Sequence, residues 1–211
     1  MEKIILVGAG GHCKSILDSL LELNTYNVIG ITDINNDFNI SGIRVIGNDD
    51  ILEEVFHSGV KNAFICVGSI GDTRVRRKIY NKLKSIGFKI PKIIDKTAVV
   101  SKNSVIEDGV FIGKGAIVNS CSFIGNNSII NSGAIVEHDC KIGEFVHVAP
   151  GVTMSGGVNI GNDSHIGTGA TIIQNISIGN NSIIGAGSVI VKNINPYSKV
   201  YGNPGRTVNH E

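Results

Sequence analysis

The chain has 211 residues, of which 42% are hydrophobic, and its 19 basic and 18 acidic side chains give a formal net charge of +1. This length and composition predict two modest domains, each with an apolar core. The balanced charge argues against the basic surfaces of nucleic-acid-binding and membrane-surface proteins, so we expect neither partner. No apolar run reaches membrane-spanning length and no signal-peptide pattern opens the chain, which predicts a cytoplasmic protein.

Four cysteines, Cys13, Cys66, Cys121 and Cys140, occur without a CxxC spacing. The spacing therefore predicts neither a disulfide framework nor a zinc knuckle. Cys140 occupies a small-residue position of a six-residue repeat, where an unpaired cysteine is expected in the core.

The first predicted element is a strand over residues 3–7, followed by the glycine-rich turn 8–12 (GAGGH) and a helical pattern that continues to Leu21. Strand, glycine turn and helix open many nucleotide-binding units, because glycines let a phosphate approach backbone N–H groups at a helix N-terminus. The full dinucleotide fingerprint is absent, since Cys13 stands at the position of its third glycine. An alternative is that the glycines only make a tight turn.

Four further elements complete the first predicted domain. They are, in order, a strand, a helix, a strand and a helix, over residues 27–32, 49–56, 62–67 and 72–86. Together they predict a Rossmann-like α/β domain with βαβ topology over residues 1–90. Ligands bind parallel sheets at the carboxyl ends of the strands, so Gly8, Asp33 and Gly68 are expected to face one crevice.

From Ile94 to Ile190 every sixth residue is apolar, without interruption. A small residue often stands two positions before each of these residues, and glycine often follows. A period of six would scatter the apolar stripe around a helix of roughly 3.6 residues per turn, but it fits one short strand and one corner. The pattern predicts a parallel β-helix of hexapeptide repeats over residues 91–211.

Three hexapeptides would make one triangular coil of eighteen residues, so residues eighteen apart should stack on one face. His147 and His165 have this spacing. The pattern stops after Ile190, at residues 192–197, and the ending 200–206 has a loop-like composition. We expect this tail to cap the last coil.

The interior of such a coil is narrow and dry, so ionisable side chains should lie outside it or at its corners. Three histidines are of this kind: His138, His147 and His165. His138 lies between two acidic residues in the segment 137–140 (EHDC), where a carboxylate can fix the imidazole tautomer and raise its basicity. A general base that deprotonates an amine or a hydroxyl needs these properties.

Two other interpretations of the histidines are open. The EHDC segment can be a charged surface corner without a catalytic role. The three histidines can also hold a metal ion across a subunit boundary. Because spacings of nine and eighteen residues do not bring three ligands together within one chain, we expect no metal.

A set of motifs resembles the sugar O-/N-acetyltransferases of the NeuD/PglD type, a hexapeptide-repeat acyltransferase family. The set comprises the GAGGH turn, the uninterrupted hexapeptides, the EHDC segment, the segment 142–148 (IGEFVHV) and the C-terminal segment 202–204 (GNP). The resemblance covers nearly the whole chain. It implies a left-handed β-helix, a homotrimer with acetyl-CoA between adjacent subunits, and an N-terminal domain that holds a nucleotide-linked sugar.

The resemblance also implies roles for residues of the catalytic region. His138 would be the general base, and Asp139 would orient it and raise its basicity. His147 would hydrogen-bond the thioester of acetyl-CoA. Asn131 matches a substrate-contacting position.

Two further groups match binding positions of the family. The nucleotide-sugar site corresponds to Gly10, Gly11, His12, Asp33 and Gly68. The acetyl-CoA site corresponds to backbone groups along the pantetheine arm at Gly156, Thr168 and Ala186, and to Lys192 beside the CoA phosphates. The chain departs from the pattern at residues 32–34 (TDI), where family members can carry two acidic residues and this chain has one.

These observations predict an acetyl-CoA-dependent N-acetyltransferase that acts on the amino group, at C4, of a nucleotide-linked deoxyamino sugar. The amine would attack the thioester directly, since no residue stands out as an activated nucleophile. A near alternative is O-acetylation of sialic acid or a related sugar. An alternative of another class is a non-catalytic nucleotide-sugar-binding scaffold, against which the retention of His138 and Asp139 argues.

Overall fold

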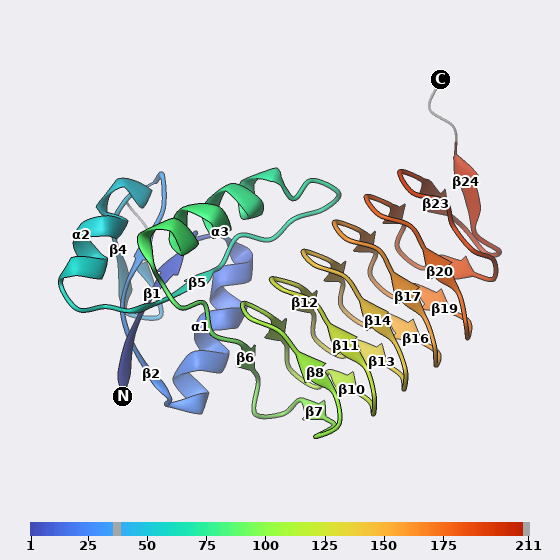
Figure 1. Cartoon of the computed structure of the whole chain (residues 1–211), viewed down its shortest axis with the longest axis horizontal. Coiled ribbons are helices and arrows are strands. Elements are labelled where there is room, and N and C mark those ends of the chain that lie inside the picture. The colour runs from blue at the N-terminus through green and yellow to red at the C-terminus, as the bar shows by residue number, and fades with distance from the viewer. Residues whose placement is uncertain (36–38, 209–211) are drawn as a thin grey trace. The chain divides into compact units, whose positions relative to one another are not determined.

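The computed structural model describes residues 1–35 and 39–208, and the chain forms two compact units (Figure 1). The N-terminal unit comprises residues 1–68 and 74–96, and the repeat unit comprises residues 69–73 and 97–211. The short segment 69–73 therefore belongs to the repeat unit although it lies within the N-terminal half of the sequence. The assignment of separate functions to residues 1–90 and 91–211 stays a prediction.

The N-terminal unit is built around a five-stranded sheet with the order β3-β4-β2-β1-β5. Its elements are β1 (Glu2–Val7), α1 (Gly11–Leu23), β2 (Tyr26–Thr32), β3 (Asn39–Ile40), β4 (Ile43–Gly47), η1 (Asp49–Ile51), α2 (Leu52–His57), β5 (Asn62–Ile65), α3 (Arg74–Ile86) and β6 (Ile93–Ile94). Strands β1, β2, β4 and β5 are parallel, and only β3 runs antiparallel to its neighbour. The predicted α/β fold with βαβ topology is confirmed.

Strand β1 lies inside this sheet, between β2 and β5. Residues 4–7 are completely or almost completely buried, as expected for a parallel strand that is covered on both faces. Helix α1 contributes Ile16, Leu17 and Leu20, which are fully buried, while Ile79 and Leu83 of α3 belong to one hydrophobic cluster with Ile5 and Val7 of β1. The spacing of three and four residues along each helix explains why one face alone is buried.

Some boundaries differ from the sequence prediction. The hairpin of β3 and β4 was not predicted, because it is short and β4 only alternates between half-buried and exposed residues. The predicted helix 49–56 begins as the 3₁₀ turn η1 before α2. Helix α3 begins at Arg74 and not at residue 72, because residues 69–73 pack within the repeat unit.

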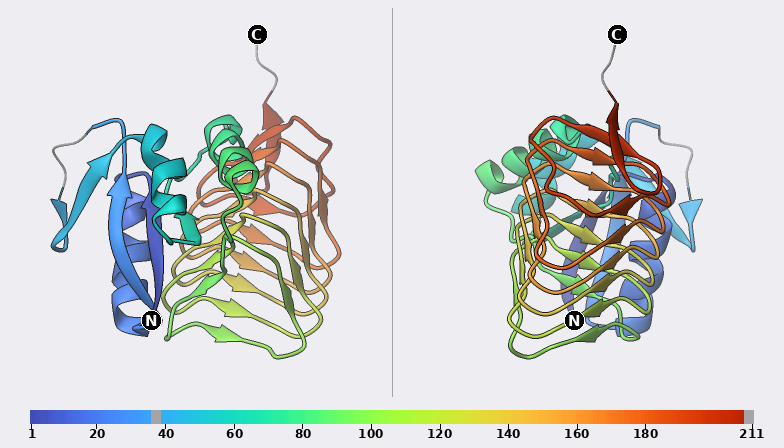
Figure 2. Two further views of the ribbon diagram at one scale, coloured as in Figure 1. Left: turned by 60° about the vertical axis from the view of Figure 1, so that its left-hand side comes forward. Right: turned by 90° about the vertical axis from the view of Figure 1, so that its right-hand side faces the viewer.

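The repeat unit is a left-handed β-helix whose two-residue strands form three parallel faces, seen stacked in Figure 2. Face 1 contains β7 (Val99–Val100), β10 (Ile117–Val118), β13 (Ile135–Val136), β16 (Thr153–Met154), β19 (Thr171–Ile172) and β22 (Val189–Ile190). Face 2 contains β8 (Val105–Ile106), β11 (Phe123–Ile124), β14 (Lys141–Ile142), β17 (Asn159–Ile160) and β20 (Ser177–Ile178). Face 3 contains β9 (Phe111–Ile112), β12 (Ile129–Ile130), β15 (His147–Val148), β18 (His165–Ile166) and β21 (Ile183–Ile184).

The eighteen-residue register is confirmed by the pairing of successive coils. His147 pairs with His165 and Val148 with Ile166, and the strands from β7 to β22 keep this offset, whereas the last strand on face 3 pairs with β21 at an offset of sixteen. The inward aliphatic residue is buried from Ile106 onward, and the residue two positions earlier is buried from Val110 onward, including Cys140 as predicted. Interior serines link neighbouring segments: Ser128 Oγ donates to the Gly143 carbonyl at 2.7 Å and accepts from Val146 N–H at 3.0 Å.

Two features of the corners explain the spacing of glycine. Every sixth residue from 109 to 187 has a positive φ, and Asp139 is one of these residues, with φ 60°. Glycines directly after the inward aliphatic residue serve a different purpose, since a Cβ at Gly125 would lie 2.7 Å from the backbone of the next coil. The hexapeptide pattern alone does not distinguish these two roles of glycine.

The C-terminal segment is more regular than its composition predicts. Strand β23 (Lys199–Tyr201) adds to face 3 beside β21, and β24 (Arg206–Val208) pairs with it antiparallel. The expectation of a loop-like segment was wrong, because the fully buried Val200 anchors a hairpin on the last coil. None of the helices in the described ranges is both long and apolar enough to cross a bilayer.

Candidate active site

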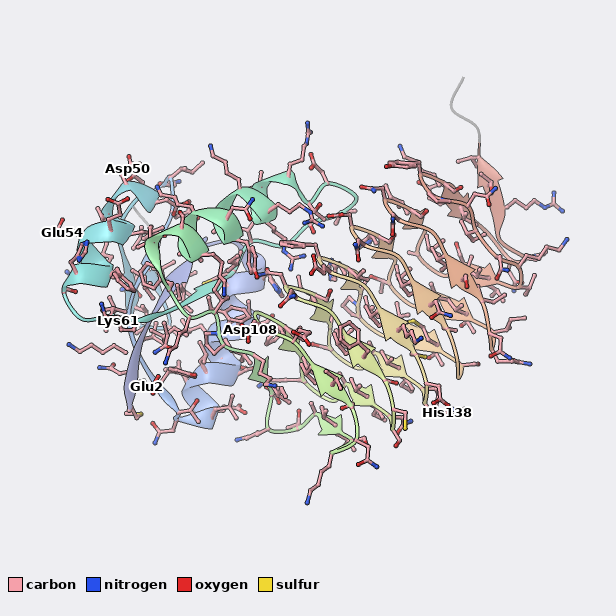
Figure 3. All side chains as sticks on the ribbon, in the orientation of Figure 1. Glu2, Asp50, Glu54, Lys61, Asp108 and His138 are labelled. Atoms are coloured by element: carbon pink, nitrogen blue, oxygen red, sulfur yellow. The ribbon has the colours of Figure 1, made fainter. Side chains whose placement is uncertain are left out.

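His138 lies at the corner between faces 1 and 2, after β13 and before β14 (Figure 3). The corner needs a residue with left-handed backbone, and Asp139 takes that conformation. Asp and Asn tolerate it better than most side chains. This geometry brings Asp139 Oδ2 to 2.7 Å from His138 Nδ1.

The contact with Asp139 determines the chemistry of the imidazole. The hydrogen bond to Asp139 raises the pKa of His138, and the charges of Asp139 and Glu137 act in the same direction. With Nδ1–H donating to the carboxylate, Nε2 carries the free lone pair of the neutral ring. The two side chains are 63% and 64% exposed, so Nε2 is accessible to a substrate.

Gly156 lies against this imidazole from the next coil. A Cβ at position 156 would stand 2.6 Å from His138 Nε2, and Gly157 N–H donates to the His138 carbonyl at 2.9 Å. Glycine at this position therefore leaves room for the ring. The structure places this predicted acetyl-CoA residue beside the predicted base.

The eighteen-residue register distributes the other predicted acetyl-CoA residues over two corners. Lys192 follows β22 in the corner column of His138 and Gly156, and its side chain is exposed. Thr168 and Ala186 lie between faces 3 and 1, where Gly187 N–H donates to the Thr168 carbonyl at 2.8 Å. Their contact with acetyl-CoA stays a prediction.

His147 is held on face 3 by contacts at both ring nitrogens. Nδ1 lies 2.9 Å from the backbone carbonyl of Ser69, which can only accept, so this nitrogen carries the proton. Nε2 lies 3.2 Å from Asn131 Nδ2, and Asn131 Oδ1 accepts from Ser132 N–H at 2.8 Å. A neutral His147 thus accepts at Nε2, and donation to a thioester oxygen requires its imidazolium form.

Two observations around His147 were not expected from the sequence. The backbone carbonyl of Ser69, in the segment 69–73, contacts the His147 ring. The same segment is bound to the repeat coils by a 2.5 Å hydrogen bond that Thr73 Oγ1 donates to Asp163 Oδ1. The ring of His165 packs edge-on against His147 with centroids 5.0 Å apart. Burial lowers the pKa of His165, which is 8% exposed, so this ring is neutral at ordinary pH.

His138 and His147 occupy different parts of one chain. His138 lies at the corner after β13 of face 1, and His147 is in strand β15 of face 3.

Within residues 1–35 and 39–208, no group of three or more His, Cys, Asp or Glu side chains is arranged to hold a metal ion.

The N-terminal unit contains a cavity of about 510 Å³ at the carboxyl ends of its central strands. It is lined by Val7, Gly8, Thr32, Asp33, Ile34, Asp49, Asp50, Val67, Val75, Lys78, Ile79 and Lys82. Of the predicted crevice residues, Gly8 and Asp33 line it. The remaining lining residues, above all those of α3, were missed because a helix does not reveal from sequence which strand end it faces.

Asp33 organises the glycine turn beside this cavity. Its Oδ2 accepts from Ala9 N–H at 2.6 Å and its Oδ1 accepts from Asn35 N–H at 3.0 Å. Gly8 has a φ of 101°, and a Cβ there would stand 2.6 Å from Val67 Cγ2. Gly8 is therefore required for the tight turn itself, as the alternative interpretation of the glycines supposes.

The presence of glycine at positions 10 and 11 has a different explanation from that of Gly8. A Cβ at either position would meet no atom within 4 Å among the described residues, so packing does not demand glycine. Gly10 precedes α1 without a side-chain cap, and the first turn of α1 has no acidic residue. This leaves an open helix N-terminus of the kind that binds anions. His12 packs beside Gly68, where a Cβ would lie 3.7 Å away, but neither residue lines the cavity.

Comparisons with known proteins agree with both units. Residues 3–83 match the PglD N-terminal domain family, and residues 121–156 and 157–192 match the bacterial transferase hexapeptide family. A histidine-to-asparagine variant of perosamine N-acetyltransferase from Caulobacter crescentus, in complex with CoA and GDP-perosamine, is 31% identical, with a TM-score of 0.95 over 100% of this chain and 98% of that chain. The chain belongs to the NeuD/PglD-type sugar acetyltransferases. The predicted hexapeptide acetyltransferase with acetyl-CoA as co-substrate is confirmed.

Other members of this group have the same architecture. The acetyltransferase domain of PglB from Neisseria gonorrhoeae is 35% identical, with a TM-score of 0.93 over 99% of this chain and 100% of that chain. The same domain has been solved in complex with acetyl coenzyme A. WeeI from Acinetobacter baumannii, at 24% identity and a TM-score of 0.87 over 99% of this chain, shares the fold.

Proposed function

We propose that this acetyltransferase transfers the acetyl group of acetyl-CoA to the C4 amino group of a nucleotide-linked deoxyamino sugar, with His138 as general base. The observation that carries this proposal is the pair of His138 and Asp139, in which a 2.7 Å hydrogen bond leaves an exposed basic Nε2 next to Gly156. The similarity to an enzyme that binds GDP-perosamine and CoA supports an amino sugar as acceptor.

The reaction proceeds by direct transfer. The substrate amine attacks the thioester carbonyl carbon and forms the C–N bond, while His138 Nε2 accepts the proton that the nitrogen loses. The C–S bond then breaks, and the imidazolium returns this proton to the departing CoA sulfur. Asp139 stabilises the imidazolium between these steps, which is the state that its carboxylate favours.

The remaining predicted residues have binding roles in this proposal. His147 and Asn131 form a fixed polar group for the acetyl thioester and the sugar, and Gly156, Thr168, Ala186 and Lys192 line the path of CoA. The nucleotide is bound by the N-terminal unit near Gly10, Gly11, His12, Asp33 and Gly68.

The active protein is a homotrimer in this proposal. The outer faces of the repeat unit expose large apolar residues, including Val99 on face 1 and Val105 and Phe123 on face 2. Exposed apolar surface of this kind is suited to subunit contact. The use of acetyl-CoA, a cytoplasmic metabolite, supports a cytoplasmic location.

A panel of acceptors tests the function. CoA release is measured with nucleotide-linked sugars that carry either an amino or a hydroxyl group at C4, and with free sialic acid. We expect release only with the amino sugars, and a product heavier by one acetyl group. Release with hydroxyl acceptors alone would establish the O-acetyltransferase instead. Tight sugar-nucleotide binding without release from any acceptor would establish the scaffold.

A further inference from the structure

We propose that His165 is a positioning residue of the active site, whose ring packs against His147 and holds that imidazole in its working orientation. The inference rests on the proposed function, in which His147 and Asn131 form a fixed polar group for the acetyl thioester and the sugar. His165 touches neither substrate and acts only through His147.

The stacking of the coils places His165 directly beside His147. The two residues occupy the same outward position of β15 and β18 and are register partners on face 3. Because neighbouring parallel strands are only about 4.8 Å apart, equivalent side chains of successive coils come into contact. The two ring centroids lie 5.0 Å apart and the ring planes are inclined by 69°, an edge-to-face arrangement that aromatic pairs prefer.

The hydrogen bonds of His147 leave one motion of its ring open. Nδ1 donates to the Ser69 carbonyl at 2.9 Å, and Nε2 accepts from Asn131 Nδ2 at 3.2 Å. Both bonds meet the ring at its nitrogens, so they permit the ring to rock about the line that joins these two atoms. Since both nitrogens are occupied, the His165 ring packs against carbon atoms or a face of His147, away from that line. The contact therefore restricts the motion that the hydrogen bonds allow.

His165 has the properties of a packing group and not of a proton carrier. Its side chain is 8% exposed, and its Nδ1 is buried without a hydrogen-bond partner among residues 1–35 and 39–208. Burial lowers the pKa of His165, which keeps the ring neutral. A charged ring here would repel a protonated His147, and a neutral ring does not. What His165 offers His147 is the shape of its ring.

The unpartnered Nδ1 makes it possible to separate the ring from its nitrogens. A buried polar atom without a partner costs stability, and an apolar group of similar shape avoids that cost. The other outward residues of this column are apolar, namely Phe111, Ile129 and Ile183. His165→Phe should therefore keep the contact with His147 and melt at the wild-type temperature or above it.

The first test compares the kinetics of variants at position 165. Phe keeps an aromatic ring, Asn keeps a polar amide without a ring, and Ala removes both. We expect His165→Phe to retain kcat within about twofold, and His165→Asn and His165→Ala to lower it about tenfold, because a small misplacement of a reacting group is costly. CoA lacks the acetyl group, so its affinity in isothermal titration should change by less than about twofold.

Ile172→Ala is the matched control for a general loss of stability. Ile172 is fully buried in β19 on face 1, so its truncation leaves a cavity in the coil without altering the contacts of His147 described above. The melting temperature should fall at least as far as in His165→Ala, while kcat stays near that of wild type.

The second test asks whether His165 acts through His147. If it only positions that ring, the double variant His147→Ala/His165→Ala should have the same kcat as His147→Ala, because no ring is left to position. An independent role would multiply the two losses.

Nitrogen NMR of histidine-labelled protein supplies a measurement that needs no activity. Above the pH range in which imidazoles titrate, wild-type His147 should show a protonated Nδ1 and an unprotonated Nε2, as its partners require. His165→Ala should give a mixture of the two tautomers, whereas His165→Phe and Ile172→Ala should resemble wild type. The spectrum of His147→Ala identifies the signals.

Four results would overturn the inference. They are a wild-type kcat in His165→Ala, losses that multiply in the double variant, an unchanged His147 spectrum in His165→Ala, and a folded His165→Phe variant as slow as His165→Ala. Failure of the proposed function would look different. Wild type would then transfer no acetyl group to an amino sugar, while the spectra would still show whether His165 fixes the His147 ring.

Discussion

Asp139 has two functions in one residue, since it turns a corner of the β-helix and it holds His138 Nδ1. Asn also tolerates the left-handed conformation, so Asp139→Asn should keep the corner while removing the negative charge. The hydrogen bond to the Asp139 carboxylate, together with the negative charges of Asp139 and Glu137, raises the pKa of His138, so the neutral amide should lower it. A general base acts in its neutral form, above its pKa, so a lower pKa keeps it active at lower pH.

We therefore expect the acidic limb of the pH profile of kcat/KM to move to lower pH in Asp139→Asn, together with a lower kcat because the weaker base accepts the proton less well. Asp108→Asn, which alters an acidic corner residue with no histidine beside it in sequence, should leave the profile unchanged. An unshifted limb in Asp139→Asn would show that the observed ionisation does not belong to His138.

Gly156→Ala tests the space around the imidazole. The new methyl group would lie within 2.6 Å of the present position of His138 Nε2, so the ring must move. We expect a large loss of kcat with little change in the melting temperature, because His138 is exposed and can swing away from the coil. A variant with wild-type kcat would indicate that the ring position seen here is not the catalytic one.

At the scale of elements, the turn between β1 and α1 depends on Asp33 at the end of β2. Asp33→Ala removes the acceptor for Ala9 N–H and Asn35 N–H, so the glycine turn loses its anchor. The KM for the sugar nucleotide should rise while the KM for acetyl-CoA stays nearly constant, since that substrate is bound by the repeat unit. An equal loss for both substrates would indicate misfolding instead.

The elements that could be predicted from the sequence are those with a regularly repeating pattern of apolar residues. The six-residue repeat predicts the stacking of His147 on His165 and the burial of Cys140, because each coil repeats the last. The β3–β4 hairpin has no such pattern and a half-buried surface, so its residues do not stand out.

Only the local contacts of the candidate site could be predicted from the sequence. The pairing of His138 with Asp139 is local and could be inferred from the EHDC segment. The contact of Ser69 with His147 joins residues 78 positions apart through a backbone carbonyl, which any residue type supplies, so no residue identity signals it. Lys78, in the wall of the cavity, was missed for a related reason, since its environment is created by the packing of α3 and not by a motif.

In the whole repeat unit, His138 lies at the corner between faces 1 and 2, whereas His147 lies on face 3. If both act on one acetyl group, they must come from adjacent subunits of the proposed trimer. Hybrid trimers that contain His138→Ala and His147→Ala chains should then regain activity, because some interfaces combine two intact histidines. Random assembly predicts about a quarter of the wild-type activity.

Co-expression of the two variants with different affinity tags supplies these hybrids, and each variant expressed alone is the control. Hybrids as inactive as the separate variants would show that both histidines must belong to the same chain. A fully active monomer in native mass spectrometry would contradict the trimer itself.

The proposed reaction depends on the removal of the amine proton by His138, and His138→Ala eliminates the group that removes it. The substitution removes an exposed side chain at a corner, so the fold and the affinity for CoA, measured by titration, should persist. Loss of the general base should lower kcat by about 10²–10⁴. A kcat close to wild type over the range of about pH 6 to 9 would contradict it, and the base would then have to be sought elsewhere, with His165 hindered in that role by its burial.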